Sequence, residues 1–142
     1  MSPLPYWNKI LIPTDFSEDS LRAVAEAARL QTLTQADVVL AHITEPRFEG
    51  LRIHTGDLHH QMEIAAKQQL ESLAAASFPA ANVSVVVKEG RAADAICNLA
   101  QSLKVDAIVI GSHGVTAMKH LMLGSVTEKV VRHAPCHVLV VR

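Results

Sequence analysis

The chain has 142 residues, a length that suits one compact domain and predicts a single unit over residues 1–142. Hydrophobic residues make up 49% of it and charged residues 19%, a composition that excludes intrinsic disorder and supplies the side chains for a sizeable core. The formal net charge of −1 argues against a nucleic-acid-binding surface spread over the whole molecule.

Apolar runs and helical periods alternate from one end of the chain to the other. Short apolar runs, rich in β-branched residues and typical of buried parallel strands, occur at residues 9–12, 37–43, 83–87, 105–110 and 136–141. The segments between them carry apolar residues at helical spacing and predict helices over 18–33, 92–103 and 125–133, and one more that is marked by residues 62–73 and closed by Phe78-Pro79. This order of elements predicts an α/β fold with right-handed crossovers and helices on both faces of an open parallel sheet.

Residues that start or stop elements support these boundaries. Pro13 ends the first apolar run, because proline cannot donate to a sheet ladder. Ser17 is placed to cap the first helix, with Glu18 and Asp19 in the first turn, where the helix dipole favours acids. Residues 44–56 hold one proline and two glycines and show no period, so we expect a loop long enough to suggest a role.

The sequence predicts a soluble, cytoplasmic protein whose thiols are structural. Polar residues interrupt the first twenty positions, which argues against a signal peptide, and no run approaches the ~18 apolar residues of a membrane span. Cys97 and Cys136 lack CxxC spacing and lie within apolar patterns. They are therefore expected to be buried thiols rather than ligands of a zinc site or partners in a redox pair.

Glycines gather after the fourth strand, at the kind of position where open parallel sheets place ligands. Gly111-Ser-His-Gly114 is followed nine residues later by Gly124-Ser125-Val126-Thr127, which opens a helix. Glycine lets the backbone approach an oxyanion closely, and a helix N-terminus points free N–H groups at it. Residues 111–142 also carry a local charge of +3, so an anion such as phosphate is expected at this end of the chain.

The same residues admit a purely structural interpretation. Ser125 and Glu128 are spaced as a capping box, in which they satisfy the amides at the helix start, and Gly111 suits an ordinary turn. Neither the GxxxxGK[ST] phosphate loop nor the GxGxxG dinucleotide fingerprint is present. Asp15, after the first strand, also has two interpretations. Its carboxylate can accept hydrogen bonds from ribose hydroxyls, or it can cap the turn into the first helix.

Metal and catalytic sites find less support in the pattern. Of the eight histidines, the adjacent His59 and His60 do not share a helix face, and the others lack ligand spacing. Mg²⁺ carried on nucleotide phosphates needs few protein ligands and fits better than a dedicated site. No nucleophile elbow or Ser–His–Asp order appears, and His113 is the one side chain we can place near the expected phosphates. Slow or absent turnover is therefore expected.

Taken together, these motifs resemble the universal stress protein family. The resemblance rests on Ile10-Leu-Ile-Pro-Thr-Asp15-Phe-Ser17, on His42-Ile43, and on Gly111-x2-Gly114-x9-Gly124-Ser125 before the closing Val-Leu-Val-Val. It spans nearly the whole chain in order, and the G-x2-G-x9-G-[S/T] spacing is that of the family's ATP-binding branch. The resemblance implies a doubly wound, Rossmann-like fold similar to the adenine nucleotide alpha hydrolases, with five strands in the order 3-2-1-4-5 and two helices on each face.

The resemblance also implies which residues would bind an adenine nucleotide (ATP, ADP or AMP). Asp15 would contact the ribose, the backbone of Pro13 and Thr14 would line the base pocket, and the main chain of Ile43 would hold the adenine edge. The ribose and phosphates would be covered by Gly111, Ser112, His113 and Gly114, and the phosphates would be taken by Gly124, Ser125, Val126 and Thr127. Val115 stands where members often carry a basic residue, for which Lys119 or His120 is the expected substitute.

A homodimer is implied in the same way, through residues 136–141 paired antiparallel across a two-fold axis. This strand is apolar on both faces and carries few charged side chains, so its exposed edge can pair with a second copy of the chain. The alternative is a monomer whose edge is covered by residues 44–56. The expected function is an adenine-nucleotide-binding module in stress response or signalling. The alternatives are a nucleotide-independent interaction protein, such as a regulatory partner of a transporter or kinase, and a slow ATPase.

Overall fold

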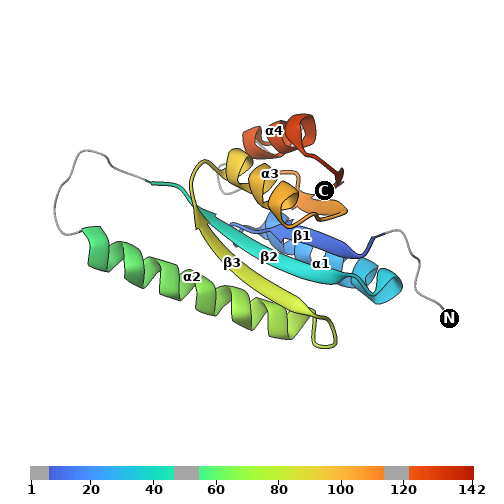
Figure 1. Cartoon of the computed structure of the whole chain (residues 1–142), viewed down its shortest axis with the longest axis horizontal. Helices are drawn as coiled ribbons and strands as arrows, with labels where there is room; N and C mark the ends of the chain where they lie inside the picture. Colours follow the sequence, from blue (N-terminus) through green and yellow to red (C-terminus); the bar gives the residue numbers. More distant parts are fainter. Residues whose placement is uncertain (1–6, 47–54, 114–121) are drawn as a thin grey trace.

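The computed structural model describes residues 7–46, 55–113 and 122–142, and in these ranges strands and helices alternate strictly (Figure 1). The strands are β1 (Lys9–Pro13), β2 (Asp37–Thr44), β3 (Val83–Glu89), β4 (Ala107–Gly111) and β5 (His137–Val141). The helices are α1 (Glu18–Thr34), α2 (Thr55–Ser77), α3 (Ala92–Ser102) and α4 (Ser125–His133). The predicted alternation is confirmed, and apart from α2 the predicted boundaries lie within two residues of these.

The five strands form one parallel sheet in the order β3-β2-β1-β4-β5, which confirms the order implied by the resemblance. On one side β1 stays in register with β2 from Lys9 to Pro13. On its other side, the pairing with β4 covers only Ile10 and Leu11, whereas β4 stays paired with β5 as far as Gly111. The sheet therefore parts between β1 and β4 at its carboxyl end, where the order of the strands reverses.

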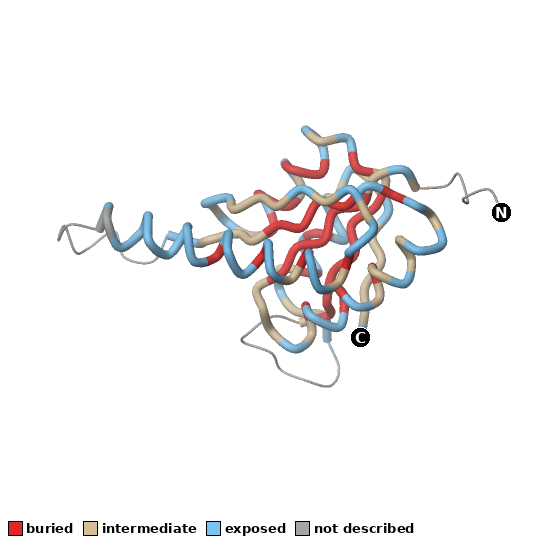
Figure 2. Tube along the Cα trace, turned by 90° about the horizontal axis from the view of Figure 1, so that it is seen from below, coloured by how far each residue is buried: buried red, intermediate tan, exposed pale blue. Residues whose placement is uncertain are grey.

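Alternating residues of the strands build two separate cores. Ile10 and Ile12 point into the core beneath α1 and α2, whereas Leu11, Val39 and Ile108 point into the core beneath α3 and α4. All five side chains are buried, and Figure 2 shows the buried positions concentrated along the strands and the helix faces that cover them. The prediction of two helices on each face is confirmed.

Helix α2 is longer than its apolar period predicts. The expected helix is marked by apolar residues over 62–73 and closed by Phe78-Pro79, whereas α2 spans 23 residues, Thr55–Ser77. Its C-terminal half packs on the sheet through Ala66, Leu70 and Ala74, while residues 58–65 are exposed and project beyond the sheet in Figures 1 and 2. Residues 58–61 are exposed and carry no sustained apolar period, so the pattern missed the first turns. The loop expected over 44–56 is correspondingly too long, because residue 44 closes β2 and residues 55–56 belong to α2.

Candidate functional site

A cavity of about 100 Å³ lies where β1 and β4 part. It is enclosed by the turn after β1, the ends of β2 and β4, and the first turns of α1, α3 and α4. The lining residues are Pro13, Thr14, Asp15, Ser20, Ile43, Ala92, Ile96, Ile110, Gly111, His113, Val126 and Thr127. The cavity thus occupies the carboxyl ends of the strands, as the order of elements predicts.

The structure brings most of the expected nucleotide-binding residues together. Eight of the twelve line this cavity: Pro13, Thr14, Asp15, Ile43, Gly111, His113, Val126 and Thr127. Three more, Ser112, Gly124 and Ser125, do not line it. Gly114, with Val115, Lys119 and His120, lies outside the described residues. The pattern missed Ser20, Ala92, Ile96 and Ile110, which only the topology points to, because it places the start of α3 and the end of β4 at this edge.

The turn after β1 is shaped by hydrogen bonds from its own side chains. The Asp15 carboxylate accepts from the Ser17 N–H at 3.0 Å, and the Thr14 hydroxyl accepts from the Phe16 N–H at 3.0 Å. Phe16 has a φ of 64°, in the left-handed region that is costly for residues other than glycine. Asp15 therefore does stabilise the turn, and it lines the cavity as well.

Buried groups anchor this turn from behind. The Ser20 hydroxyl donates to the Ser17 carbonyl at 3.0 Å, so in its 2.8 Å contact with the Thr14 hydroxyl it is Thr14 that donates. The His42 Nδ1 lies 2.8 Å from the Thr14 carbonyl oxygen, which can only accept, so Nδ1 carries a proton. The His42 ring also packs on Phe16, with centroids 4.9 Å apart. The turn that carries Asp15 is thus tied to both α1 and β2.

Gly111, the last residue of β4, is required by a close approach of two backbones. A Cβ at this position would lie 2.8 Å from both the carbonyl carbon and the oxygen of Asp19 in α1. The Gly111 carbonyl accepts from the Thr127 hydroxyl at 2.7 Å, which fastens α4 to β4. Glycine here therefore serves the packing of α1 against β4, whatever it contributes to a ligand.

Helix α4 starts without a side-chain cap. Its N-cap is Gly124 and its first helical residue is Ser125, so the capping-box interpretation of Ser125 is wrong. Within the described part of the chain, no side chain hydrogen-bonds at this N-cap, and Val126 and Thr127 of the first turn line the cavity. Uncapped amides at a helix N-terminus favour an anion.

The N-terminus of α3 reaches the same cavity through Ala92 and Ile96. There the Glu45 carboxylate, just beyond β2, accepts from the Ala92 N–H at 3.1 Å. An acidic side chain is favoured at this position by the helix dipole. Glu45 thereby joins the end of β2, which carries Ile43, to the first turn of α3.

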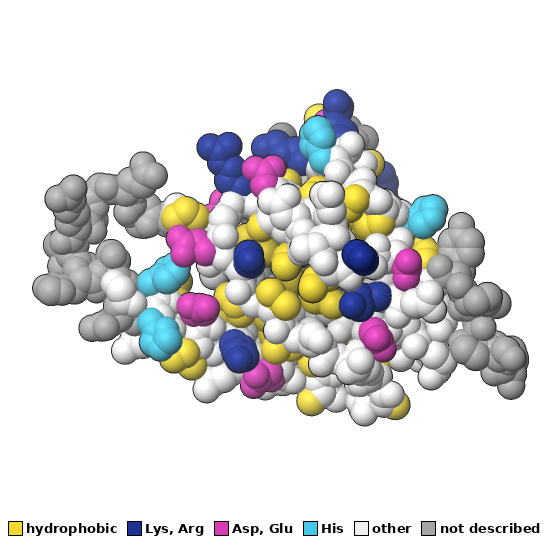
Figure 3. All heavy atoms as spheres, in the orientation of Figure 1, with side chains coloured by type: hydrophobic (Ala, Val, Ile, Leu, Met, Phe, Trp, Pro, Cys, Tyr) yellow, Lys and Arg dark blue, Asp and Glu magenta, His cyan; other side chains and the backbone are white. Residues whose placement is uncertain are grey.

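The basic residues near the C-terminus lie elsewhere. Lys129 and Arg132 lie on the exposed surface of α4, and Arg132 pairs with Glu128 at 3.0 Å. Figure 3 shows Lys and Arg side chains gathered at the top of the molecule, where Figure 1 places α4. No lysine or arginine of the described residues lines the cavity, and Lys119 lies outside them, so the link between this local charge and an anion stays a prediction. Helix N-termini contribute a favourable potential for an anion at the cavity.

His113 connects three segments around the cavity. Its Nδ1 lies 3.0 Å from the Ser112 hydroxyl and 3.4 Å from the Asp19 carboxylate, and its Nε2 contacts the Met122 carbonyl oxygen. Serine and aspartate therefore meet the same ring nitrogen. A catalytic triad requires them on opposite nitrogens, so this group is not a nucleophile relay.

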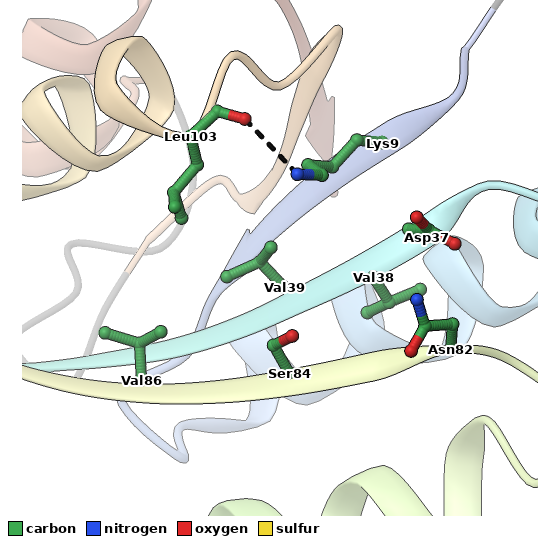
Figure 4. Close-up of a pocket in the computed structure, with 8 residues that line it drawn as sticks. All are labelled: Lys9, Asp37, Val38, Val39, Asn82, Ser84, Val86 and Leu103. Carbon is green, nitrogen blue, oxygen red and sulfur yellow. Dashed lines mark hydrogen bonds between the residues drawn. The ribbon is translucent and has the colours of Figure 1, made fainter.

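A second cavity, of about 150 Å³, lies toward the amino ends of the strands (Figure 4). The Lys9 ammonium donates to the Leu103 carbonyl at 3.4 Å, at the C-terminus of α3, where the helix dipole favours a cation. Val39 and Val86 contribute apolar side chains to its lining. None of the residues expected to bind nucleotide reaches it.

The described residues form neither a membrane span nor a cluster of metal ligands. Among them, no helix is long and apolar enough to cross a membrane, and no three His, Cys, Asp or Glu side chains gather to hold a metal ion. Cys97 and Cys136 are free thiols that are partly rather than fully buried, which corrects the prediction of buried cysteines. Desolvation raises the pKa of both thiols, and nearby Asp94 adds to the shift of the Cys97 pKa.

Comparison with known proteins extends these observations. The model of the universal stress protein family matches residues 7–142. A universal stress protein of Thermus aquaticus is 35% identical over 135 residues, covering 94% of this chain and 97% of its own. Universal stress protein MJ0577 of Methanocaldococcus jannaschii is 30% identical over 157 residues, covering 96% of this chain and 95% of its own. The solved structure of MJ0577 superimposes with a TM-score of 0.86 at 32% identity, over 97% of this chain and 96% of that one. A crystal structure of a universal stress protein in complex with cAMP gives a TM-score of 0.71 at 25% identity, over 96% and 98%.

Proposed function

This chain belongs to the universal stress protein family, and from that premise we propose that the cavity between β1 and β4 binds an adenine nucleotide. The observation that carries the proposal is the convergence on one cavity of eight residues from four separate segments of the chain. These are the residues to which the family resemblance assigns the nucleotide. A relative of the same fold has been solved in complex with cAMP, which supports an adenine ligand.

Each part of the nucleotide has a chemically suitable partner in the proposed complex. The Asp15 carboxylate accepts from the ribose hydroxyls, and the main chain at Pro13 and Ile43 borders the base. The phosphates are bound by the amides of Ser125 to Thr127, next to Gly124, whose own N–H donates to the Ser112 carbonyl at 2.7 Å, and by the backbone of residues 111–114, with the dipole of α4 behind them. Mg²⁺ would be carried by the phosphates and needs no protein ligand.

The biological role that we propose is that of an ATP-binding homodimer in stress response or signalling. Binding, rather than turnover, is its activity, because His113 is the one described cavity side chain of a type suited to proton transfer near the phosphates, and its ring is committed to structural contacts. No described lysine or arginine lines the cavity to clamp the charge that develops during phosphoryl transfer.

Isothermal titration of the purified protein, stripped of carried-over nucleotide, with ATP, ADP, AMP and GTP tests this function. Adenine nucleotides should bind, and GTP should bind more weakly, because main-chain groups at Ile43 suit an adenine edge. In Asp15→Asn the side-chain oxygen can still accept from Ser17, so the turn is kept while the charge is lost. We expect it to weaken ATP, ADP and AMP alike, by about five- to tenfold, as for loss of a charge-assisted hydrogen bond.

Asp37→Asn serves as the matched control, because Asp37 is an exposed carboxylate at the first residue of β2, away from the cavity. This variant should bind every nucleotide as the parent protein does. Absence of binding heat for all four nucleotides, with the fold intact by circular dichroism, would favour the nucleotide-independent interaction protein. Sustained release of phosphate from ATP would instead identify an ATPase.

A further inference from the structure

His113 lies at a junction that controls the shape of the proposed phosphate site. It lies two residues beyond the end of β4, its side chain is 12% exposed, and it lines the cavity. One ring nitrogen contacts the carbonyl of Met122, two residues before the N-cap of α4, and the other faces Asp19 in the first turn of α1. The ring therefore bridges the segment that enters α4 and the first turn of α1.

The hydrogen-bond partners restrict where the protons of this ring can be. The Met122 carbonyl only accepts, so Nε2 must carry a proton in every state that keeps this contact. In the neutral ring Nδ1 then accepts from the Ser112 hydroxyl, 3.0 Å away. In the same state its lone pair faces the Asp19 carboxylate at 3.4 Å, a contact between two acceptors.

Protonation of Nδ1 changes this local balance. The Nδ1–H of the imidazolium donates to the Asp19 carboxylate. The Ser112 hydroxyl then either donates to another acceptor or accepts from Nδ1. Arg22 pairs with Asp19, and Asp15 lines the same cavity as the ring. The two carboxylates bring negative charge to this region, whereas Arg22 and the N-terminus of α4 contribute positive potential.

A phosphate at the start of α4 would add negative charge close to the ring and cancel the effect of the helix dipole. We propose that His113 is a positioning residue that takes up a proton when a phosphate-bearing adenine nucleotide binds. The charged ring then holds α1, β4 and the segment before α4 together around the phosphates. This inference rests on the proposed function, and it makes nucleotide affinity fall as the pH rises.

Titration calorimetry with ADP tests the proton uptake directly. Measurements at pH 6, 7 and 8, each in two buffers of different ionisation enthalpy, give the number of protons bound with the nucleotide. Because a terminal phosphate also titrates near pH 6, the difference between proteins is the readout. The matched variant is His113→Gln, whose side-chain amide can donate to the Met122 carbonyl but cannot be protonated.

The parent protein should lose about three- to tenfold in ADP affinity between pH 6 and 8 beyond the loss seen in His113→Gln, since histidine changes charge in this range. At pH 8 the two proteins should bind within about twofold of each other, because both keep the donor to Met122. His59→Gln is the control for a histidine outside the cavity: His59 pairs with Glu89 and should leave the pH dependence unchanged.

The results separate the two proposals. Equal proton uptake and equal pH dependence in the parent and in His113→Gln would overturn the role of His113 while leaving nucleotide binding in place. Absence of ADP binding by the parent at every pH would overturn both. Should His113→Gln fail to fold, ¹H–¹⁵N spectra of the histidine rings of the parent decide instead. The His113 ring should be more fully protonated at pH 7.5 with ADP than without it, and an unchanged ring would overturn the inference.

Discussion

At Gly111, a single hydrogen atom in place of a side chain allows α1 to approach the end of β4. A Cβ would meet the Asp19 backbone at 2.8 Å, and neither backbone can move without shifting a buried element. We expect Gly111→Ala to lower the free energy of unfolding by about 1–3 kcal/mol, the usual cost of overpacking. Urea denaturation followed by circular dichroism measures this change.

Gly56 provides the matched comparison. Nothing lies within 4 Å of a Cβ at this position, and it is the second residue of α2. Gly56→Ala should leave the protein equally stable or stabilise it by up to about 1 kcal/mol, because alanine is the better helix former. Equal stabilities of the two variants would show that the Gly111 contact is not tight in solution.

The two thiols should react slowly. Desolvation raises the pKa of Cys97 and of Cys136, and the nearby Asp94 and Asp106 add to the respective shifts. A raised pKa means less thiolate at any given pH, so alkylation by iodoacetamide should be slower than in the chain unfolded in urea. The pH profile of the alkylation rate should be displaced to higher pH in the folded protein than in the unfolded chain. Coincident profiles for the folded and unfolded chain would contradict the burial of these groups.

Two serines at helix starts differ in what they do for their helices. The Ser17 side chain accepts from the Ser20 N–H at 3.3 Å and is the N-cap of α1. Ser125 is the exposed first residue of α4, beyond the N-cap. Ser17→Ala should therefore destabilise the protein by about 1 kcal/mol. Ser125→Ala should change the stability by less than about 0.5 kcal/mol, as at an ordinary surface site.

Thermal unfolding of both variants checks this prediction, and nucleotide titration adds a second readout. In the proposed complex Ser125 contributes to phosphate binding, so its variant should weaken ATP more than AMP while the stability stays the same. A stability loss in Ser125→Ala as large as that in Ser17→Ala would restore the capping box that the geometry of α4 contradicts.

On the scale of the whole molecule, β5 forms one edge of the sheet. The Ser112 N–H donates to the Val141 carbonyl at 2.9 Å, so the backbone N–H and carbonyl of Val141 point toward β4. Because these directions alternate along a strand, the N–H groups of Val138 and Val140 point to the open edge. In the proposed homodimer these are the groups that pair with a second copy.

Light scattering at micromolar concentration should therefore give twice the 15.4 kDa mass of one chain. Val138→Pro removes an outward N–H and should give the mass of a monomer, without taking a hydrogen bond from the β4 ladder. Val138→Thr keeps both the N–H and the β-branched shape, and should remain a dimer. A parent protein that scatters as a monomer would refute the dimer.

The sequence by itself determined the features that depend on neighbours along the chain. Apolar period and turn residues predicted the α/β alternation, the Ser17 cap and a ligand site at the carboxyl ends of the strands, because each follows from local spacing. The order of the strands was implied by the family resemblance rather than by the pattern. Spacing also singled out Asp15 and the motif from Gly111 to Thr127, whereas the roles of Pro13, Thr14 and Ile43 came from the resemblance.

Contacts between distant segments were decided only by the tertiary structure. The parting of β1 from β4, the entry of Ala92 and Ile96 into the cavity, and the fit of Gly111 against Asp19 each join residues far apart in sequence. Helix α2 extends past the apolar period because its first turns cover nothing that would impose one. The attachment of α4 to β4 likewise joins distant residues, since the Thr127 hydroxyl donates to the Gly111 carbonyl. The spacing of residues along the chain does not encode contacts between distant segments. These contacts are set by how the helices and strands pack against one another.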